Sequence, residues 1–176
     1  MRILLFLLDT VFFFLVAAAL LRAWMNQQRV SMQGQPGRFV MALTDWLVQP
    51  LRKLLPGAVA KGRIDGGSLV AALLLALLHG ALWLFIAMGA EAPWSAVPVL
   101  GLKFLLRALL QGLMVLLIVY AVLSWVQPRS PLMGTLDRLT SPMVAPLRRV
   151  IPLVGGVDLS VLVLIVALQV GLMLLG

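Results

Sequence analysis

Each of the four long apolar stretches of this sequence carries a polar side chain of a kind that is buried between helices. These side chains are Asp9, His79, Gln111 and Gln169. A polar group at membrane depth is costly, so such groups pair with one another or mark a site for an ion or a proton. We therefore expect either a hydrogen-bond network between helices or an ion site. One His and one Asp are too few ligands for a metal centre, so neither a metal nor another cofactor is expected.

A run of proline, leucine and basic residues occurs twice. The first copy comprises Pro50, Leu51, Arg52, Lys53 and Pro56, and the second comprises Pro146, Leu147, Arg148, Arg149 and Pro152. Basic side chains beside an apolar surface bind anionic lipid headgroups or an acidic protein partner. An ordinary membrane anchor needs the charges but not the same prolines at the same spacing. The pattern thus indicates a docking surface or a headgroup clamp, with a plain anchor as the alternative.

Carboxyl and hydroxyl side chains stand just before two of the apolar stretches. Asp65 and Ser68 precede one stretch, and Asp158 and Ser160 precede another. The first turn of a helix has unpaired N–H groups, so these side chains are expected to cap helices. The alternative is that the two carboxylates pair with nearby arginines and hold each basic run against the apolar helices.

The residues of an enzyme site are not found. The sequence has no nucleophile beside a base, no Gly-rich phosphate loop and no cysteine. The basic residues are too few, and too close to the apolar stretches, to build a surface that reads nucleic acid. We expect a protein that is not an enzyme and does not bind nucleic acid.

The elements that carry these residues are expected to span a membrane. Hydrophobic residues make up 62% of the 176 residues, charged residues only 11%, and the mean hydropathy is +1.09. A helix needs about 20 apolar residues to cross the hydrocarbon core. Four such runs cover about 3–25, 67–88, 104–126 and 159–175. Since they lack the alternation of barrel strands, the sequence predicts an all-α membrane protein with four transmembrane helices.

The chain contains an internal repeat. Segments 44–56 and 140–152 align without a gap and share Thr, Pro, Leu, Arg and a final Pro. Each lies between two apolar runs, so the repeating unit is a span, a connector and a second span. The predicted division is a first repeat at 1–90, a linker at 91–103 and a second repeat at 104–176.

Both connectors are expected to form amphipathic helices in the headgroup plane. Their apolar residues recur every three or four positions, which places them on one helix face. The apolar face comprises Phe39, Leu43, Trp46, Leu47, Leu51 and Leu54 in the first connector, and Leu132, Leu136, Leu139, Met143, Leu147 and Val150 in the second. Pro50 and Pro146 should kink or restart the helix. Ser141 followed by Pro142 is typical of a helix start and favours a restart there.

The basic residues predict how the chain is oriented. With two spans in each repeat, both connectors lie on the same side of the membrane. The connectors carry Arg29, Arg38, Arg52, Lys53, Lys61, Arg63, Arg129, Arg138, Arg148 and Arg149. The opposite side has Arg2, Lys103 and Arg107. The positive-inside rule then places both connectors in the cytoplasm and both termini outside, with the four polar residues in the outer half of the bilayer.

The doubled motif Thr-x5-Pro-Leu-Arg-basic-x2-Pro resembles the repeat of the YggT (YlmG-like) family of small bacterial membrane proteins. The resemblance covers nearly the whole chain and is closest in the second copy, where Gly-Gly-x-Asp158-Leu159-Ser160 follows. The first copy departs from it by having Asp45 and Trp46 in place of Ser-Pro. The resemblance implies a multi-pass inner-membrane protein. It also implies relatives linked to cell division, nucleoid or plastid organisation, osmotic tolerance and cofactor assembly onto a photosynthetic cytochrome.

These observations predict a scaffold or assembly factor in the bacterial inner membrane. The expected partners are anionic lipid headgroups, an unidentified protein recruited to the connectors, and a second copy of the chain. Cell division or envelope organisation is the process that the resemblance favours. The alternative is ion or osmolyte homeostasis through the intramembrane polar residues.

Overall fold

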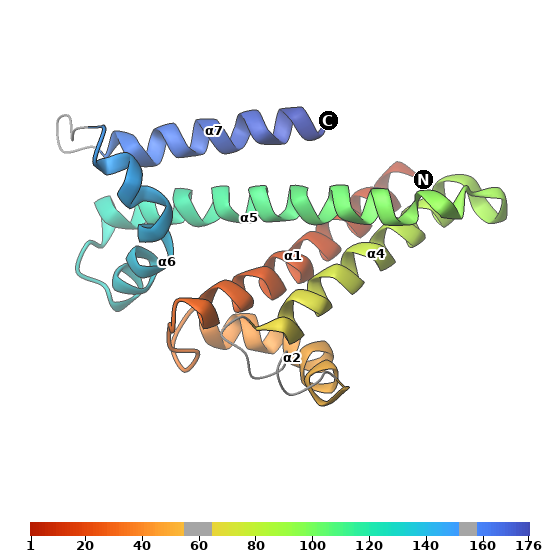
Figure 1. Ribbon diagram of the computed structural model, residues 1–176, viewed down its shortest axis with the longest axis horizontal. Coiled ribbons are helices and arrows are strands. Elements are labelled where there is room, and N and C mark those ends of the chain that lie inside the picture. The colour runs from red at the N-terminus through yellow and green to blue at the C-terminus, as the bar shows by residue number, and fades with distance from the viewer. Residues whose placement is uncertain (55–64, 152–157) are drawn as a thin grey trace. The chain divides into compact units, whose positions relative to one another are not determined.

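The computed structural model describes residues 1–54, 65–151 and 158–176, and every regular element within these ranges is helical (Figure 1). The elements are α1 (Arg2–Gln27), α2 (Gly37–Leu54), α4 (Gly66–Met88), the short 3-10 helices η1 (Gly89–Glu91) and η2 (Trp94–Ala96), α5 (Val97–Val126), α6 (Pro131–Arg148) and α7 (Leu159–Leu175). The all-α fold predicted from the sequence is therefore confirmed.

Three of the described helices are long and apolar enough to cross a membrane. They run over Arg2–Gln27, Gly66–Glu91 and Trp94–Val126. The fourth apolar helix, α7, has 17 residues, or about 26 Å at the rise of an α-helix, against about 30 Å of hydrocarbon. The membrane class is thus supported, while a fourth span remains a prediction.

The chain divides into two compact units, Met1–Leu109 and Leu110–Gly176, and each is described here by itself. Helix α5 contributes its first part to one unit and its second part to the other. It begins at Val97, inside the segment 91–103 that was predicted as a linker. Pro98 is compatible with this start, because the first turn of a helix does not use the N–H that proline lacks.

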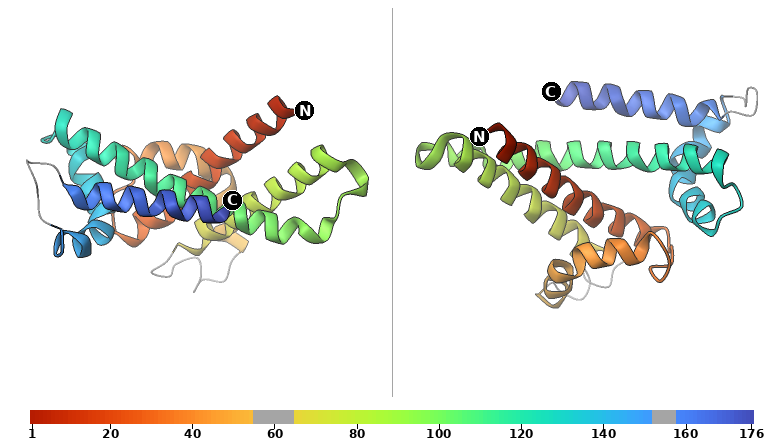
Figure 2. Two further views of the ribbon diagram at one scale, coloured as in Figure 1. Left: turned by 90° about the horizontal axis from the view of Figure 1, so that it is seen from above. Right: turned by 180° about the vertical axis from the view of Figure 1, so that it is seen from behind.

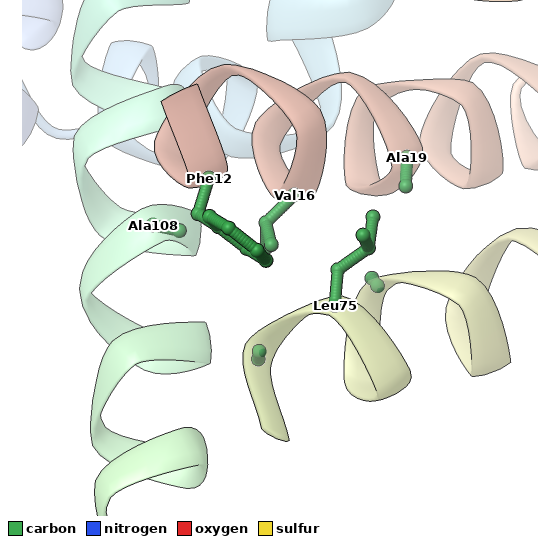
Figure 3. Close-up of a cluster of buried hydrophobic side chains, with 7 residues drawn as sticks. Phe12, Val16, Ala19, Leu75 and Ala108 are labelled. Carbon is green, nitrogen blue, oxygen red and sulfur yellow. The ribbon is translucent and has the colours of Figure 1, made fainter. Parts of the chain in front are cut away.

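In the first unit, α1 and α4 pack along each other (Figures 1 and 2). Phe12, Val16 and Ala19 of α1 face Leu75 of α4, and Ala108 of α5 joins this core (Figure 3). Lipid tails are as apolar as these side chains, so close packing must hold the helices together.

Small residues provide this close packing between α4 and α5. A Cβ added at Gly80 would lie 3.1 Å from the backbone N of Gly101 and 3.3 Å from the carbonyl oxygen of Val97. Gly80 and Gly101 therefore let the two backbones approach at this crossing.

In the second unit, α6 joins the end of α5 to the start of α7. The helix begins at Pro131, and the Ser130 side chain caps it by accepting a hydrogen bond from the Met133 N–H. It then continues through Pro142 and Pro146. The helix restart predicted at Ser141 and Pro142 is therefore wrong. The helix starts instead at an earlier Ser-Pro pair of the same connector, Ser130 and Pro131.

The continuity of α6 has a packing cause. Leu139, Thr140 and Val144 are fully buried on both sides of Pro142. A restart would rotate the later turns and expose part of this row. Burial of an aliphatic side chain is worth about 1.5–3 kcal/mol, comparable to the roughly 3 kcal/mol that proline costs inside a helix.

Candidate functional site

The last turn of α2 is tied to the start of α4 by three side chains, Arg52, Asp65 and Ser68, which we call the first clasp. Arg52 Nη2 donates to Asp65 Oδ2 at 2.5 Å. Asp65 also accepts hydrogen bonds from the Ser68 N–H at 3.2 Å and from the Ser68 hydroxyl at 2.8 Å. Asp65 is thus both the N-cap of α4 and the partner of the arginine in the first Pro-Leu-Arg run.

The environment keeps the Asp65 carboxylate ionised. Its side chain is 1% exposed, and this burial raises its pKa. The hydrogen bonds from Arg52 and Ser68 and the charge of Arg52 outweigh burial, so the pKa of Asp65 lies below its ordinary value of 3.8. The backbone also fits the guanidinium closely, since a Cβ added at Gly67 would lie 2.7 Å from Arg52 Cγ.

The second unit has a corresponding arrangement of Arg148, Asp158, Ser160 and Tyr120, which we call the second clasp. Arg148 Nε donates to Asp158 Oδ2 at 2.6 Å, and Asp158 accepts from the Ser160 N–H at 3.0 Å as the N-cap of α7. Arg148 Nη2 also donates to the Tyr120 hydroxyl at 2.8 Å. This clasp therefore joins α6 to both α5 and α7.

Hydrogen bonding in the second clasp favours the charged form of the arginine. Burial lowers the pKa of Arg148, but the hydrogen bonds to Asp158 and Tyr120 outweigh burial and raise that pKa above its ordinary value. The Tyr120 hydroxyl in turn donates to Asp137 Oδ1 at 3.2 Å. The Arg148 guanidinium thus contacts one carboxylate and one phenol, and Asp137 is linked to it through the phenol.

The remaining residues of the two Pro-Leu-basic runs face outward. Pro50 and Lys53 are exposed in α2, and Pro146 and Arg149 are exposed in α6. Leu51 and Leu147 are half-buried at the matched positions. Pro56 and Pro152, the final prolines of the two runs, lie outside the described residues.

The two connector helices bury matched positions. Val40, Thr44 and Val48 are buried in α2, and Leu136, Thr140 and Val144 are buried in α6. The hydroxyls of Thr44 and Thr140 donate to the carbonyl oxygens of Val40 and Leu136, at 2.7 and 2.9 Å. An internal repeat predicts that its two connector helices bury the same positions of the aligned motif.

Two of the four polar residues singled out in the apolar stretches meet. His79 Nε2 lies 2.7 Å from Asp9 Oδ1, and the imidazole stacks on Phe104 with 3.6 Å between ring centroids. The His79 side chain is 7% exposed and that of Asp9 is 51% exposed. Gln111 and Gln169 belong to the second unit. Neither forms a side-chain hydrogen bond within the described part of the chain.

The described residues contain no group of three His, Cys, Asp or Glu side chains that could hold a metal ion. The arrangement of charges is one of arginine–carboxylate pairs at helix ends and one imidazole–carboxylate pair in the first unit. Such pairs fix helices and orient charge.

Sequence reasoning missed Arg22 and Tyr120. Arg22 is 5% exposed, and its Nη1 donates to Thr44 Oγ1 at 2.8 Å and to Asp45 Oδ1 at 2.7 Å. It ties the end of α1 to the middle of α2. The signal for Arg22 was its position inside an apolar run, where a guanidinium requires a partner. Tyr120 is the one tyrosine of the sequence and also lies in an apolar run.

Comparison with known proteins places this fold in a family. The profile of the CCB3/YggT family matches residues 1–86 and 99–176. The chain is 36% identical to an "Uncharacterized protein in proC 3'region" of Vibrio alginolyticus, over 97% of this chain and 92% of that protein. It is 34% identical to the "Uncharacterized protein YggT" of Escherichia coli K12, over 97% of this chain and 87% of that protein. No solved structure matches the chain. On the family match and these near full-length similarities, the chain belongs to the CCB3/YggT family.

Proposed function

We propose that this protein is a non-enzymatic scaffold or assembly factor of the bacterial inner membrane, which recruits a protein partner to α2 and α6. In this proposal α7 is a fourth span, the chain is a tandem repeat, and both connector helices lie on the cytoplasmic side. The observation that carries it is the pair of clasps. In each, the arginine of the Pro-Leu-Arg run is held by the aspartate that caps the next apolar helix.

The clasps support recruitment because they separate two kinds of basic residue. Arg52 and Arg148 are held in ion pairs with Asp65 and Asp158, although their side chains are 37% and 38% exposed, whereas Lys53 and Arg149 beside them are exposed and are in none of the ion pairs of the described residues. A helix whose end is already fixed loses less conformational entropy when a partner binds. Exposed lysine and arginine on such a helix attract an acidic partner and steer its approach.

The basic residues also support the cytoplasmic placement. Arg29, Arg38 and Arg129 are exposed near the ends of the spans, as are Lys53 and Arg149. Each basic residue near an anionic leaflet is worth roughly 1 kcal/mol. These charges would hold α2 and α6 at the membrane surface and orient them for a partner.

Site-specific photo-crosslinking in cells tests recruitment. A photoreactive residue would replace Gln49 in one variant and Ala145 in another, and crosslinked species would be identified by mass spectrometry. We expect one defined protein at one or both positions. The double variant Lys53→Glu, Arg149→Glu should reduce that crosslink at least about tenfold, which corresponds to 1.4 kcal/mol of binding. Arg129→Glu is the control, since it removes an exposed charge outside both runs and should leave the crosslink in place.

Absence of a specific crosslink at both positions would contradict recruitment by these helices. Equal loss in Arg129→Glu would show that the crosslink reports overall charge instead of the two runs.

A second candidate function is movement of a proton or another ion, and the Asp9–His79 pair favours it. The half-exposed Asp9 carboxylate and the buried His79 imidazole lie within hydrogen-bond distance, and ionisable groups within an apolar stretch are candidates for a proton or ion pathway. Uptake of protons or of another ion by proteoliposomes that contain the whole protein would be measured for the native chain, Asp9→Asn and Gln111→Leu. Loss of uptake in Asp9→Asn, with the Gln49 crosslink unchanged, would support transport as a function that is separate from recruitment.

A further inference from the structure

Helix α2 has two apolar faces, and only one of them is used by the first unit. Val40, Thr44 and Val48 form the buried row. Phe39, Trp46 and Leu54 form a second row, and they are 56%, 61% and 81% exposed. We call these three residues the outer row.

The outer row adjoins the buried row. At 100° per residue, Leu47 lies between the two rows and is half-buried. The apolar surface of α2 is therefore continuous and wraps from the bundle side to the outer side. Arg38, Gln49 and Lys53 occupy the remaining arc and are exposed. A helix with this division of its surface rests on an apolar medium with its polar arc in water.

Water is an unfavourable medium for the outer row. Burying a phenylalanine or leucine side chain is worth about 1.5–3 kcal/mol, so three large exposed apolar side chains on one helix favour contact with something apolar. Helix α2 packs against α1 and α4, which are both long and apolar enough to span a membrane. The nearest apolar medium is therefore the acyl chains of the same bilayer.

The Trp46 side chain suits an apolar medium because its polar group is already hydrogen-bonded. Its indole N–H donates to the carbonyl oxygen of Leu43 at 2.8 Å, within the helix itself. The one polar group of the side chain is thus already paired, so the ring can enter the acyl boundary without leaving a donor unsatisfied. A tryptophan meant to bond a headgroup or a protein acceptor would keep that N–H free.

Two of the three matched positions in the second copy differ, whereas Val150, which matches Leu54, is likewise apolar and 82% exposed. Thr135 and Pro142 stand where α2 has Phe39 and Trp46. Thr135 is half-buried and donates to the carbonyl oxygen of Pro131, and Pro142 is exposed. The aromatic residues of the outer row are therefore present in only one of the two copies.

We propose that α2 seats its outer row in the acyl boundary of an anionic leaflet, with Arg38 and Lys53 on the headgroups, whereas α6 does not. The charge of these two residues complements anionic lipid. The two copies then differ in their contact with lipid: α2 places aromatic side chains among the acyl chains, and α6 has none at the matched positions. This inference rests on the proposed position of α2 at the membrane surface, but not on recruitment of a partner.

Spin labels on the whole protein test the seating. The chain has no cysteine, so a single cysteine at Phe39, Trp46, Gln49 or Pro142 gives one label per molecule. Each variant would be reconstituted in a bilayer of phosphatidylethanolamine and phosphatidylglycerol. The collision rate of the label would be measured with oxygen, which concentrates in lipid, and with a nickel chelate, which stays in water.

We expect the oxygen-to-nickel collision ratio at positions 39 and 46 to exceed that at 49 and 142 by at least about threefold. Replacing phosphatidylglycerol by phosphatidylcholine should lower the ratio at 39 and 46, because Arg38 and Lys53 lose their anionic partners. The labelled side chains are exposed, so the core of the first unit stays intact.

Four results would overturn the inference. A water-like ratio at 39 and 46 would show that the outer row is not in lipid. Low collision rates with both reagents there would show that protein covers it, such as a second copy of the chain. A lipid-like ratio at 142 would remove the difference between the two copies. A ratio at 39 and 46 that does not change when phosphatidylglycerol is replaced would remove the role of anionic lipid. None of these depends on the Gln49 crosslink, so failure of this inference and failure of recruitment are distinguishable.

Discussion

At the scale of single residues, the two clasps join a capping role to an ion pair. An aspartate and a serine before an apolar run predict a cap, because the first turn of any helix needs acceptors. The sequence does not indicate as directly which arginine pairs with the aspartate. The pairing of Arg52 with Asp65 depends on how α2 lies against α4, and the buried partners of Arg22 depend on the α1–α2 packing. Local signals thus predict local bonds, and tertiary packing decides the rest.

The first clasp should contribute measurable stability through its pair. We expect Arg52→Met to lower the free energy of unfolding by about 2 kcal/mol, because it leaves a buried carboxylate without its charged donor. Asp65→Asn removes that charge, so in the double variant the loss should be smaller than the sum of the two single losses. Unfolding by sodium dodecyl sulfate in mixed micelles would give the free energy of unfolding of the native chain, the two single variants and the double variant. Additive losses would contradict direct coupling between the two residues.

The stability that Asp65 contributes should depend on pH. Its pKa is lowered in the folded chain, so its contribution is complete above the ordinary value of 3.8 and is lost as the pH falls below that value. The stability difference between the native chain and Asp65→Asn should therefore shrink between about pH 6 and about pH 3. A difference that grows on acidification would contradict the ion-paired state of this carboxylate.

Two glycines should respond in opposite ways to alanine. Gly67→Ala would bring a Cβ against Arg52 Cγ, so it should destabilise the first unit despite alanine's better helix propensity. Gly134→Ala meets nothing within 4 Å in α6 and should raise stability by about 0.5–1 kcal/mol. Thermal unfolding of both variants in detergent provides the comparison. Equal stabilisation by both substitutions would show that Gly67 does not make room for the guanidinium.

At the scale of elements, helices were predicted well where one signal dominates. Apolar length indicated the long helices, and a period of three to four indicated helical connectors. The restart at Ser141 failed because burial of Leu139 and Val144 outweighs the preference of proline for a helix start. The sequence did not indicate which side of α2 packs against the bundle. Val40, Thr44 and Val48 lie beside the predicted apolar face, and only tertiary packing shows that they form the buried side.

The contact between α4 and α5 should depend on its small residues. Gly80→Leu would push a side chain into the Gly101 backbone, and Gly101→Leu would meet Leu77. Each should destabilise the first unit by several kcal/mol, since backbone cannot move aside as a side chain can. Ala167→Leu is the control, because Ala167 is exposed on α7. Retention of native thermal stability in Gly80→Leu would contradict a close crossing.

At the scale of the whole molecule, composition and run length were enough to predict an all-α membrane protein. They also predicted four spans, and the fourth stays a prediction because the 17 residues of α7 stand near the lower limit for crossing. The predicted orientation rests on the excess of basic residues in the connectors, and Arg2, Lys103 and Arg107 on the opposite side weaken that bias. The motif that resembles the YggT repeat was a stronger signal than either, and the family match confirms it.

The central claim is that α2 and α6 both face the cytoplasm, because a recruiting surface must lie where its partner is. Single cysteines at Gln49 and Ala145 would be treated with a membrane-impermeant maleimide in intact cells and in inverted vesicles, and a compartment-sensitive reporter would be fused to the C-terminus. The account predicts labelling of both cysteines only in inverted vesicles, with the reporter active outside the cytoplasm. Labelling of either cysteine in intact cells, or a cytoplasmic C-terminus, would contradict it.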